Sequence, residues 1–206
     1  MADLPLDLIK QLYYKEGLST IEIAKKLNVT PWVIIKFMKR MGLPRRTFSE
    51  ANIERFRKQP TTFSLKQNLS SQEEKLKIAG IMLYWAEGSK PNPTNRMRTV
   101  DFVNSNPRMI KLFLRFLREI CGIDERRLRL YLYCYANQKP ENLKRYWHRV
   151  TNIPLTQFTK PYIREDFLPE KRGKMRYGLV HIRYSDKKLL SQIERWIEEY
   201  LKICKI

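Results

Sequence analysis

One apolar helix limits the possible folds of this chain more than any other feature of its sequence. Between Leu76 and Trp85 the segment "LKIAGIMLYW" is apolar apart from one lysine, and Ala86, Glu87 and Gly88 follow it directly. Apolar residues at this density cover almost the whole circumference of a helix instead of one stripe. We therefore expect a helix that is central to its domain or shared between two copies of the chain.

The two ends of this helix carry different signals. Ser71 is followed three residues later by Glu74, the spacing of a capping box, which predicts that the helix begins there. At the other end the carboxylate of Glu87 stands directly before Gly88. Two interpretations are open: Glu87 belongs to a functional site, or it is a solvent-exposed residue of the last turn and Gly88 is a left-handed cap.

The charge of the chain indicates its class of partner. Lys and Arg total 41 against 21 Asp and Glu, which gives a net charge of +20 and a pI near 10.0. An excess of this size favours a polyanionic partner, and nucleic acid is the first expectation. Solubility through charge alone is the alternative. Because 43% of the residues are hydrophobic, the chain is not a disordered basic tail.

Cysteine spacing and hydropathy indicate where such a protein works. Cys121, Cys134 and Cys204 are too far apart for a paired zinc-ligand pattern, so we interpret them as reduced packing residues. No segment reaches the ~18 uninterrupted apolar residues of a membrane span. We expect a cytoplasmic protein with no membrane partner.

Residues 1–46 are expected to form an all-α domain of three helices. Ser19 is a helix cap, while Thr30 caps a third helix whose first position is Pro31 and which Gly42 closes. Residues 47–70 are rich in Ser, Thr, Asn and Gln and are interpreted as a linker, with room for one short helix at 49–58.

The segment "STIEIAKKLNVTPWVIIKFMKR" resembles helix-turn-helix DNA-binding domains. Ala24 is the small residue that lets two helices approach, and Asn28 stands four residues later at a turn that needs a positive φ. An ordinary three-helix bundle is the alternative. The apolar positions that would close the motif's core are Ile23, Leu27, Val29, Ile34 and Phe37. The resemblance implies DNA contacts from the outer side of the third helix, through Thr30, Pro31, Trp32, Ile35, Lys36, Lys39 and Arg40.

Just beyond this motif, Arg45 and Arg46 in "GLPRRT" lie on an expected extended arm. Such an arm would follow the DNA backbone or enter a narrow A·T-rich minor groove. A plain solvated basic linker is the alternative.

Residues 71–206 are expected to form an α+β domain. The periodicity predicts helix, strand, helix, strand, helix, strand, helix, with strands at 97–105, 126–136 and 175–185. In the central strand one face would carry Arg127, Arg129, Tyr131, Tyr133 and Tyr135, and the other Leu128, Leu130, Leu132 and Cys134. Helices on the apolar face would leave the Arg/Tyr face open to a duplex, or to another segment of the protein.

The apolar helix that ends in Ala86-Glu87-Gly88, together with this element order, resembles the LAGLIDADG homing endonucleases over about 130 residues. The resemblance implies an αββαββα domain with an antiparallel, saddle-shaped sheet that binds DNA. It also implies a homodimer through the helix at 72–87, because only one copy of the motif is visible. In an active enzyme Glu87 would hold Mg²⁺ and Arg183 would assist catalysis, with His181 and Lys187 nearby; Asp101 or Asn104 would order water.

Two departures from that family shape the functional expectation. Met82 stands where the seam between copies usually has a small residue, and Arg183 cannot exchange a proton as a lysine can. We therefore expect a sequence-specific double-stranded DNA-binding protein, similar to bacterial sporulation regulators in which the nuclease chemistry is lost. The alternatives are an active Mg²⁺-dependent homing endonuclease that cuts DNA as a homodimer, and an RNA-binding protein.

Overall fold

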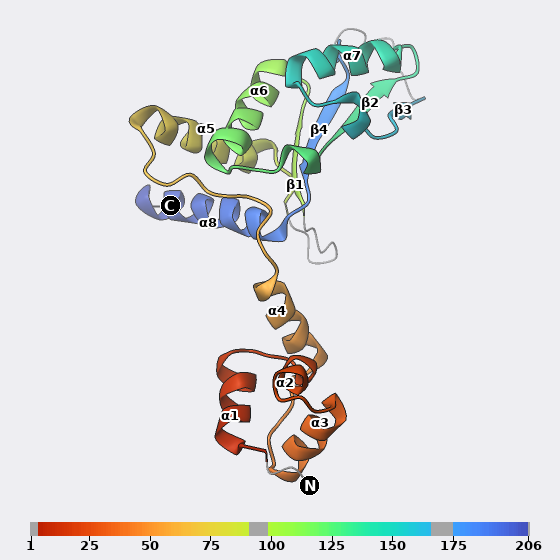
Figure 1. Cartoon of the computed structure of the whole chain (residues 1–206). Coiled ribbons are helices and arrows are strands. Elements are labelled where there is room, and N and C mark those ends of the chain that lie inside the picture. Colours follow the sequence, from red (N-terminus) through yellow and green to blue (C-terminus); the bar gives the residue numbers. More distant parts are fainter. Residues whose placement is uncertain (1–3, 91–98, 166–174, 206) are drawn as a thin grey trace. The chain divides into compact units, whose positions relative to one another are not determined.

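The computed structural model describes residues 4–90, 99–165 and 175–205 and divides the chain into two units (Figure 1). Unit 1 is Met1–Pro60 and unit 2 is Thr61–Ile206. In the described part, no helix is both long and apolar enough to cross a membrane.

Unit 1 is all-α. Its helices are α1 (Leu6–Lys10), continued by a π-helical turn η1 (Gln11–Lys15), then α2 (Thr20–Lys26), α3 (Pro31–Arg40) and α4 (Phe48–Lys58). They enclose a small core made of Leu4, Ile9, Leu12, Tyr13, Ile23, Ala24, Ile34, Phe37 and Met38.

Most local signals in unit 1 act as the sequence predicts, although Thr30 stands at the start of α3 without a side-chain capping hydrogen bond. Ser19 and Glu22 form a capping box at the start of α2, and the Ser19 N–H donates to the Glu22 carboxylate over 2.7 Å. Between α2 and α3, Asn28 adopts a φ of 52°, which is a left-handed conformation that asparagine tolerates. Pro31 occupies the first position of α3, where its missing N–H costs nothing.

The segment expected as a linker, 47–70, is divided between the two units. Its first half forms α4, which is tied to unit 1 by the ion pair of Lys58 with Glu22 at 3.6 Å. Its second half is bound to unit 2: the Thr62 hydroxyl donates to Asp186 over 2.6 Å, and the Ser64 N–H donates to the Gly122 carbonyl over 3.0 Å. Residues 62–66 are therefore fixed on unit 2.

Unit 2 is α+β, as expected. Its helices are α5 (Ser71–Glu87), α6 (Pro107–Arg115) with a π-helical continuation η2 (Phe116–Ile120), α7 (Pro140–Thr151) and α8 (Lys187–Ile203), and two 3₁₀ turns are η3 (Glu125–Arg127) and η4 (Leu155–Gln157). The strands are β1 (Val100–Asn104), β2 (Leu128–Tyr135), β3 (Tyr162–Arg164) and β4 (Leu179–Tyr184). Residues 97 and 98 of the first expected strand lie outside the described residues.

The sheet differs in detail from the expected one. The strand order is β1-β4-β2-β3; β4 is antiparallel to β1 and β2, but β3 is parallel to β2. The expectation of a wholly antiparallel sheet is therefore wrong, and β3 was not predicted. In the described residues one strand lies between α5 and α6, so the order differs from αββαββα.

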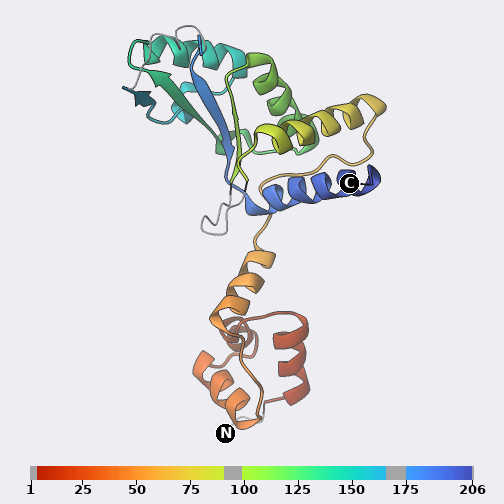
Figure 2. The same cartoon turned by 180° about the vertical axis from the view of Figure 1, so that it is seen from behind.

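The helices pack on one side of the sheet: α5, α6 and α8 contact β1, α7 contacts β2, and α8 also packs against α5 (Figures 1 and 2). The inward residues of the strands, including Phe102, Leu130 and Ile182, share one core with Phe113, Trp147 and Ile193 from the helices. The polar/apolar alternation of the strands thus decides which face is covered.

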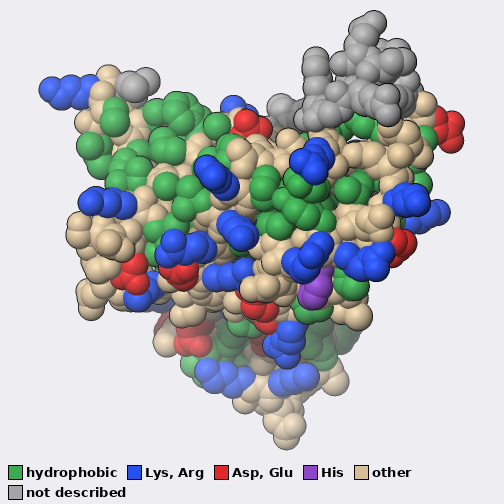
Figure 3. Space-filling model, turned by 90° about the horizontal axis from the view of Figure 1, so that it is seen from above, with side chains coloured by type: hydrophobic (Ala, Val, Ile, Leu, Met, Phe, Trp, Pro, Cys, Tyr) green, Lys and Arg blue, Asp and Glu red, His purple; other side chains and the backbone are tan. Residues whose placement is uncertain are grey.

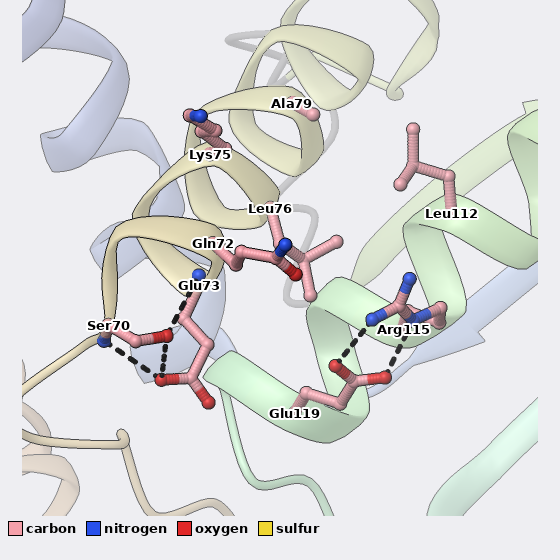
Figure 4. Close-up of a pocket in the computed structure, with 9 residues that line it drawn as sticks. All are labelled: Ser70, Gln72, Glu73, Lys75, Leu76, Ala79, Leu112, Arg115 and Glu119. Atoms are coloured by element: carbon pink, nitrogen blue, oxygen red, sulfur yellow. Dashed lines mark hydrogen bonds and ion pairs between the residues drawn. The ribbon is translucent and has the colours of Figure 1, made fainter.

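Helix α5 starts one residue earlier than the sequence signal suggested. Ser70, not Ser71, is the cap, and it forms a capping box with Glu73 (Figure 4). The adjacent pair Ser71 and Glu74 has the same spacing, so the pattern alone does not choose between them. Lys66 supports the choice of Ser70 and Glu73, because it donates to the Glu73 carboxylate over 2.5 Å.

We expect Glu73→Gln to weaken the pH dependence of stability at acid pH. The hydrogen bond from Lys66, followed by those from Ser70, lowers the pKa of Glu73 to about 2, from an ordinary value of 4.5. The depressed pKa stabilises the fold above pH 4.5, and this contribution is lost as pH falls toward 2. Urea midpoints of wild type and variant, measured at several pH values from 5 to 2, should converge at the acid end. A constant difference would contradict the assignment.

Helix α5 is buried along one stripe, not around its whole circumference. Gly80, Ile81 and Tyr84 face the core, whereas Ile78 and Trp85 at the margin of this stripe are 38% and 43% exposed. In a single chain the side of α5 that carries Ile78, Met82 and Trp85 is thus incompletely covered, and we call it the outer side.

Helix α5 does not end in a left-handed cap at Gly88. Gly88 has φ −75° and ψ 148°, so it is extended. A Cβ at this position would lie 2.4 Å from the Tyr84 carbonyl oxygen, which leaves room for glycine only. From there the chain joins the edge of β1: Gly88 pairs with Phe102, and the Ser89 N–H donates to the Asp101 carbonyl over 2.9 Å.

Candidate nucleic-acid interface

The open face of the sheet in unit 2 gathers basic and aromatic side chains from β2 and β4 and one carboxylate from β1. Because successive side chains of a strand alternate between faces, the odd-numbered residues of β1, β2 and β4 point away from the helices. The register places Asp101 beside Arg183 and Arg183 beside Arg129, while His181 lies beside Tyr131. We call this surface the sheet face; its residues are Asp101, Arg129, Tyr131, Tyr133, His181 and Arg183.

A buried carboxylate organises the sheet face. Asp101 is 5% exposed, and its two oxygens accept separate hydrogen bonds, from His181 Nδ1 at 2.9 Å and from Arg183 Nε at 2.8 Å. Since Arg183 uses only Nε here, its two terminal amino groups have no hydrogen-bond partner among the described residues. An arginine binds phosphate or a base edge by donating a pair of hydrogen bonds from such amino groups.

Aromatic rings fix the other side of the Arg183 and His181 side chains. The Arg183 guanidinium carbon lies 4.0 Å from the centroid of the Tyr131 ring, and the His181 ring stacks on Tyr133 at 4.7 Å. Tyr162 of β3 extends the row, 5.1 Å from Tyr133. Contacts on both sides hold the Arg183 and His181 side chains in place, which lowers the entropy that they lose on binding. Tyr135, expected on this face, is buried.

The remaining predicted cations lie where β2 begins and β4 ends. Arg127 donates to the Ser185 carbonyl over 2.8 Å, and Arg129 donates to the Arg126 carbonyl over 2.7 Å. Lys187 is exposed on the first turn of α8. This end of the sheet face is therefore basic, and hydrogen bonds to backbone carbonyls hold its two arginine side chains in place.

Replacing Asp101 by alanine should destabilise unit 2 by about 3 kcal/mol, because removing the carboxylate from a buried ion pair leaves the charge of Arg183 uncompensated. Urea unfolding of Asp101→Ala and Asp101→Asn measures this cost. The asparagine retains one acceptor oxygen and should lose less. The matched control is Asp7→Ala, which removes an exposed carboxylate from unit 1. Equal stabilities of Asp101→Ala and the control would mean that the carboxylate does not hold the cluster together.

Glu87 lies on the last turn of α5 and is exposed. No group of three or more His, Cys, Asp or Glu side chains in the described part of the chain could hold a metal ion. Asp101 is already bonded to His181 and Arg183, and none of the contacts between described residues joins Glu87 to Arg183. Within the described residues, the donors of one chain therefore do not form a Mg²⁺ site around Glu87; a second Glu87, from another copy, would be needed.

In unit 1, α3 carries an exposed basic and aromatic side. Trp32 is 65% exposed, and Lys36 Nζ lies 5.0 Å from its ring centroid. Lys39 and Arg40 are also exposed, and the guanidinium of Arg40 lies over the Phe37 ring. Beside this side runs a groove of about 660 Å³, lined by Leu4, Val29, Trp32, Val33, Lys36, Phe37, Lys39 and Arg40. Thr30 and Pro31 are exposed at the start of α3, and Ile35 is half-buried.

The two arginines of the expected arm differ. Arg45 is exposed, but Arg46 turns into unit 1, where it donates to the carbonyls of Tyr13 and Leu18, the latter at 3.1 Å, and lies 4.2 Å from the Tyr13 ring centroid. Arg46 therefore anchors the chain after α3, which argues against a role in contacting DNA.

Sequence reasoning missed two features of this surface. It gave Asp101 only as one of two positions that would order water, and it overlooked Tyr162. An aspartate between the apolar residues of a strand is the signal that points to Asp101, because a buried carboxylate needs partners. The other position, Asn104, accepts a hydrogen bond from the Asn106 N–H at 2.8 Å.

Comparison of the chain with protein-family models, with curated proteins and with solved structures finds no match.

Proposed function

We propose that this protein binds double-stranded DNA in a sequence-specific manner, through α3 of unit 1 and the sheet face of unit 2. The observation that carries the proposal is the set of side-chain contacts on the open sheet face. Asp101 binds Arg183 and His181. These two side chains in turn pack on Tyr131 and Tyr133. The net charge of +20 supports a polyanionic partner.

Each surface has groups suited to one part of a duplex. Arg129 and Arg183 are placed to bind phosphate, and a guanidinium with free amino groups also reads guanine. On α3, Lys36 and Lys39 would bind phosphate, while Trp32 offers apolar contact to thymine methyl groups. The arrangement of α2, the turn at Asn28 and α3 supports a helix-turn-helix role, with α3 in the major groove.

A second copy of the chain is the proposed cover for the outer side of α5. Ile78 and Trp85 are exposed there, and Met82 between them is only partly buried. Apolar residues in one row on a helix are costly to leave in water. A homodimer through α5 would extend the sheet face into a longer DNA-binding surface, as the LAGLIDADG resemblance implies.

The second candidate is a Mg²⁺-dependent endonuclease. It is favoured by the exposed position of Glu87 at the end of α5, where two copies joined through α5 would each contribute a carboxylate. Mg²⁺ would supply charge neutralisation at the phosphate. We rank binding without cleavage first, which fits a transcriptional regulator, because Glu87 is the one carboxylate that the described residues of a chain place at the end of α5.

One selection tests both candidates. The full chain is incubated with fragmented genomic DNA and Mg²⁺, and the retained fragments and all new ends are sequenced. We expect a bound consensus that remains intact. Recurrent ends at a fixed position would support the endonuclease, and then Glu87→Gln should keep binding but abolish the breaks. Retention without any consensus, or preference for structured RNA competitor over duplex DNA, would reject sequence-specific DNA binding.

A further inference from the structure

A second basic surface lies on unit 2, on the side of the sheet that the helices cover. The residues concerned are Arg108 and Lys111 on α6, and Arg145 and Arg149 on α7; all are exposed. We call them the helix-side face. α6 and α7 pack against each other over the sheet's apolar face, so the helix-side face and the sheet face point in different directions.

Ion pairing sets these cations apart from their neighbours. Three other cations on the same helices have carboxylate partners: Arg115 with Glu119 at 2.7 Å, Arg118 with Glu125 at 2.6 Å and Lys144 with Glu141 at 2.8 Å. The four cations of the helix-side face have no carboxylate partner among the described residues.

Two arginines of α7 lie so close together that their charges repel, and a bound anion would remove this repulsion. Arg145 and Arg149 are four residues apart, so their like charges stand next to each other on one side of the helix and repel. With Asn142 and His148 they line a hollow of about 480 Å³. The side chains of the hollow are held in place: Arg145 donates to the Asn142 side chain over 2.6 Å, and His148 Nδ1 donates to the Ile153 carbonyl over 2.8 Å.

The chemistry of the helix-side face indicates a phosphate backbone, not bases. No aromatic residue of α6 or α7 in the described structure is fully exposed, so stacking of unpaired bases has no platform there. Figure 3, a view from above, shows Lys and Arg side chains scattered over the surface, with hydrophobic side chains between them. Spaced cations without exposed rings suit the outside of a duplex.

We propose that the helix-side face binds the backbone of a second DNA duplex, without reading sequence, while the sheet face holds the first. This inference rests on the proposed function. One molecule of unit 2 would then bridge two DNA segments, a role that a single DNA-binding surface does not provide.

A two-duplex capture assay tests the inference with the full chain. A target duplex is fixed to beads and saturated with protein, and a fluorescent second duplex of unrelated sequence is added. The test variant is Arg145→Glu/Arg149→Glu. The matched control is Arg195→Glu/Lys202→Glu, which reverses two exposed cations of α8. A milder pair, Arg145→Gln/Arg149→Gln, and thermal unfolding of every variant guard against misfolding.

We expect the test variant to bind the first duplex within about twofold of wild type and to capture the second about tenfold less, with the control unchanged and the glutamine pair intermediate. Equal capture by the test variant and the control would overturn the inference. If the test variant loses the first duplex while Arg129→Ala/Arg183→Ala retains it, the helix-side face is the primary DNA site and the role proposed for the sheet face fails. If wild type binds neither duplex, both proposals fail.

Discussion

Replacing Gly80 by alanine is expected to lower the free energy of unfolding of unit 2 by about 2 to 3 kcal/mol, although alanine is the better helix former by about 1 kcal/mol. A Cβ on Gly80 would lie 2.1 Å from Cγ of Phe116. Phe116 is fully buried, and its ring packs between Phe113 and Trp196, at centroid distances of 5.8 and 6.2 Å. The ring therefore has little room to move, and α5 must shift away from η2.

A double-mutant cycle checks the cause of this effect. Urea unfolding is measured for Gly80→Ala in the wild type and in a Phe116→Ala background, where the ring that meets the new methyl group is gone. We expect alanine at position 80 to be neutral or stabilising in that background. Gln72→Ala, an exposed change on the same helix, is the control. A loss of the same size in both backgrounds would show that contact with Phe116 is not responsible.

Affinity for duplex DNA should fall by about 10³ to 10⁵ between 50 and 200 mM salt, because neutralising ~6 to 10 phosphates releases their counterions. The net charge of +20 makes such a number of phosphate contacts reasonable. The measurement is a fluorescence titration of the selected duplex at several salt concentrations. Salt-insensitive binding would contradict a phosphate-dominated interface.

The same titration locates the contribution of α3. Lys36→Ala/Lys39→Ala should reduce the slope of log K against log salt by about 2, because each lysine that neutralises a phosphate contributes about 1 to that slope. The control, Lys25→Ala/Lys26→Ala, removes two cations from α2 and so changes the net charge of unit 1 equally. A slope that changes as much in the control would mean that α3 makes no special contact.

The sequence was most informative where a rule acts within a few residues. The cap at Ser19, the positive φ at Asn28 and the alternation of β2 each depend on local geometry, and each is confirmed. The cap of α5 is wrong by one residue because Ser70 and Ser71 both have a glutamate three positions later. Lys66, which reaches Glu73 from the preceding segment, is a contact that favours Ser70 and that the spacing does not reveal.

Features that depend on residues far apart in the chain could not be predicted from the local sequence pattern. Asp101 finds His181 and Arg183 only through the pairing of β1 with β4, across about 80 residues of sequence. Strand β3 has three residues and pairs in parallel, which gives too short a signal to detect. Arg46 looked like part of a free basic arm because nothing local shows that Tyr13 lies beneath it.

The junction between α5 and β1 has a consequence for how this protein behaves at high concentration. A strand at the margin of a sheet offers unpaired N–H and C=O groups, which can recruit a strand from another molecule and begin aggregation. Here Gly88 and Ser89 occupy that margin of β1, through the pairing with Phe102 and the hydrogen bond to Asp101. An incoming strand would have to unwind the last turn of α5 first. The turn that displays Glu87 therefore also shields the β1 edge of the sheet from cross-β growth at Asp101 and Phe102.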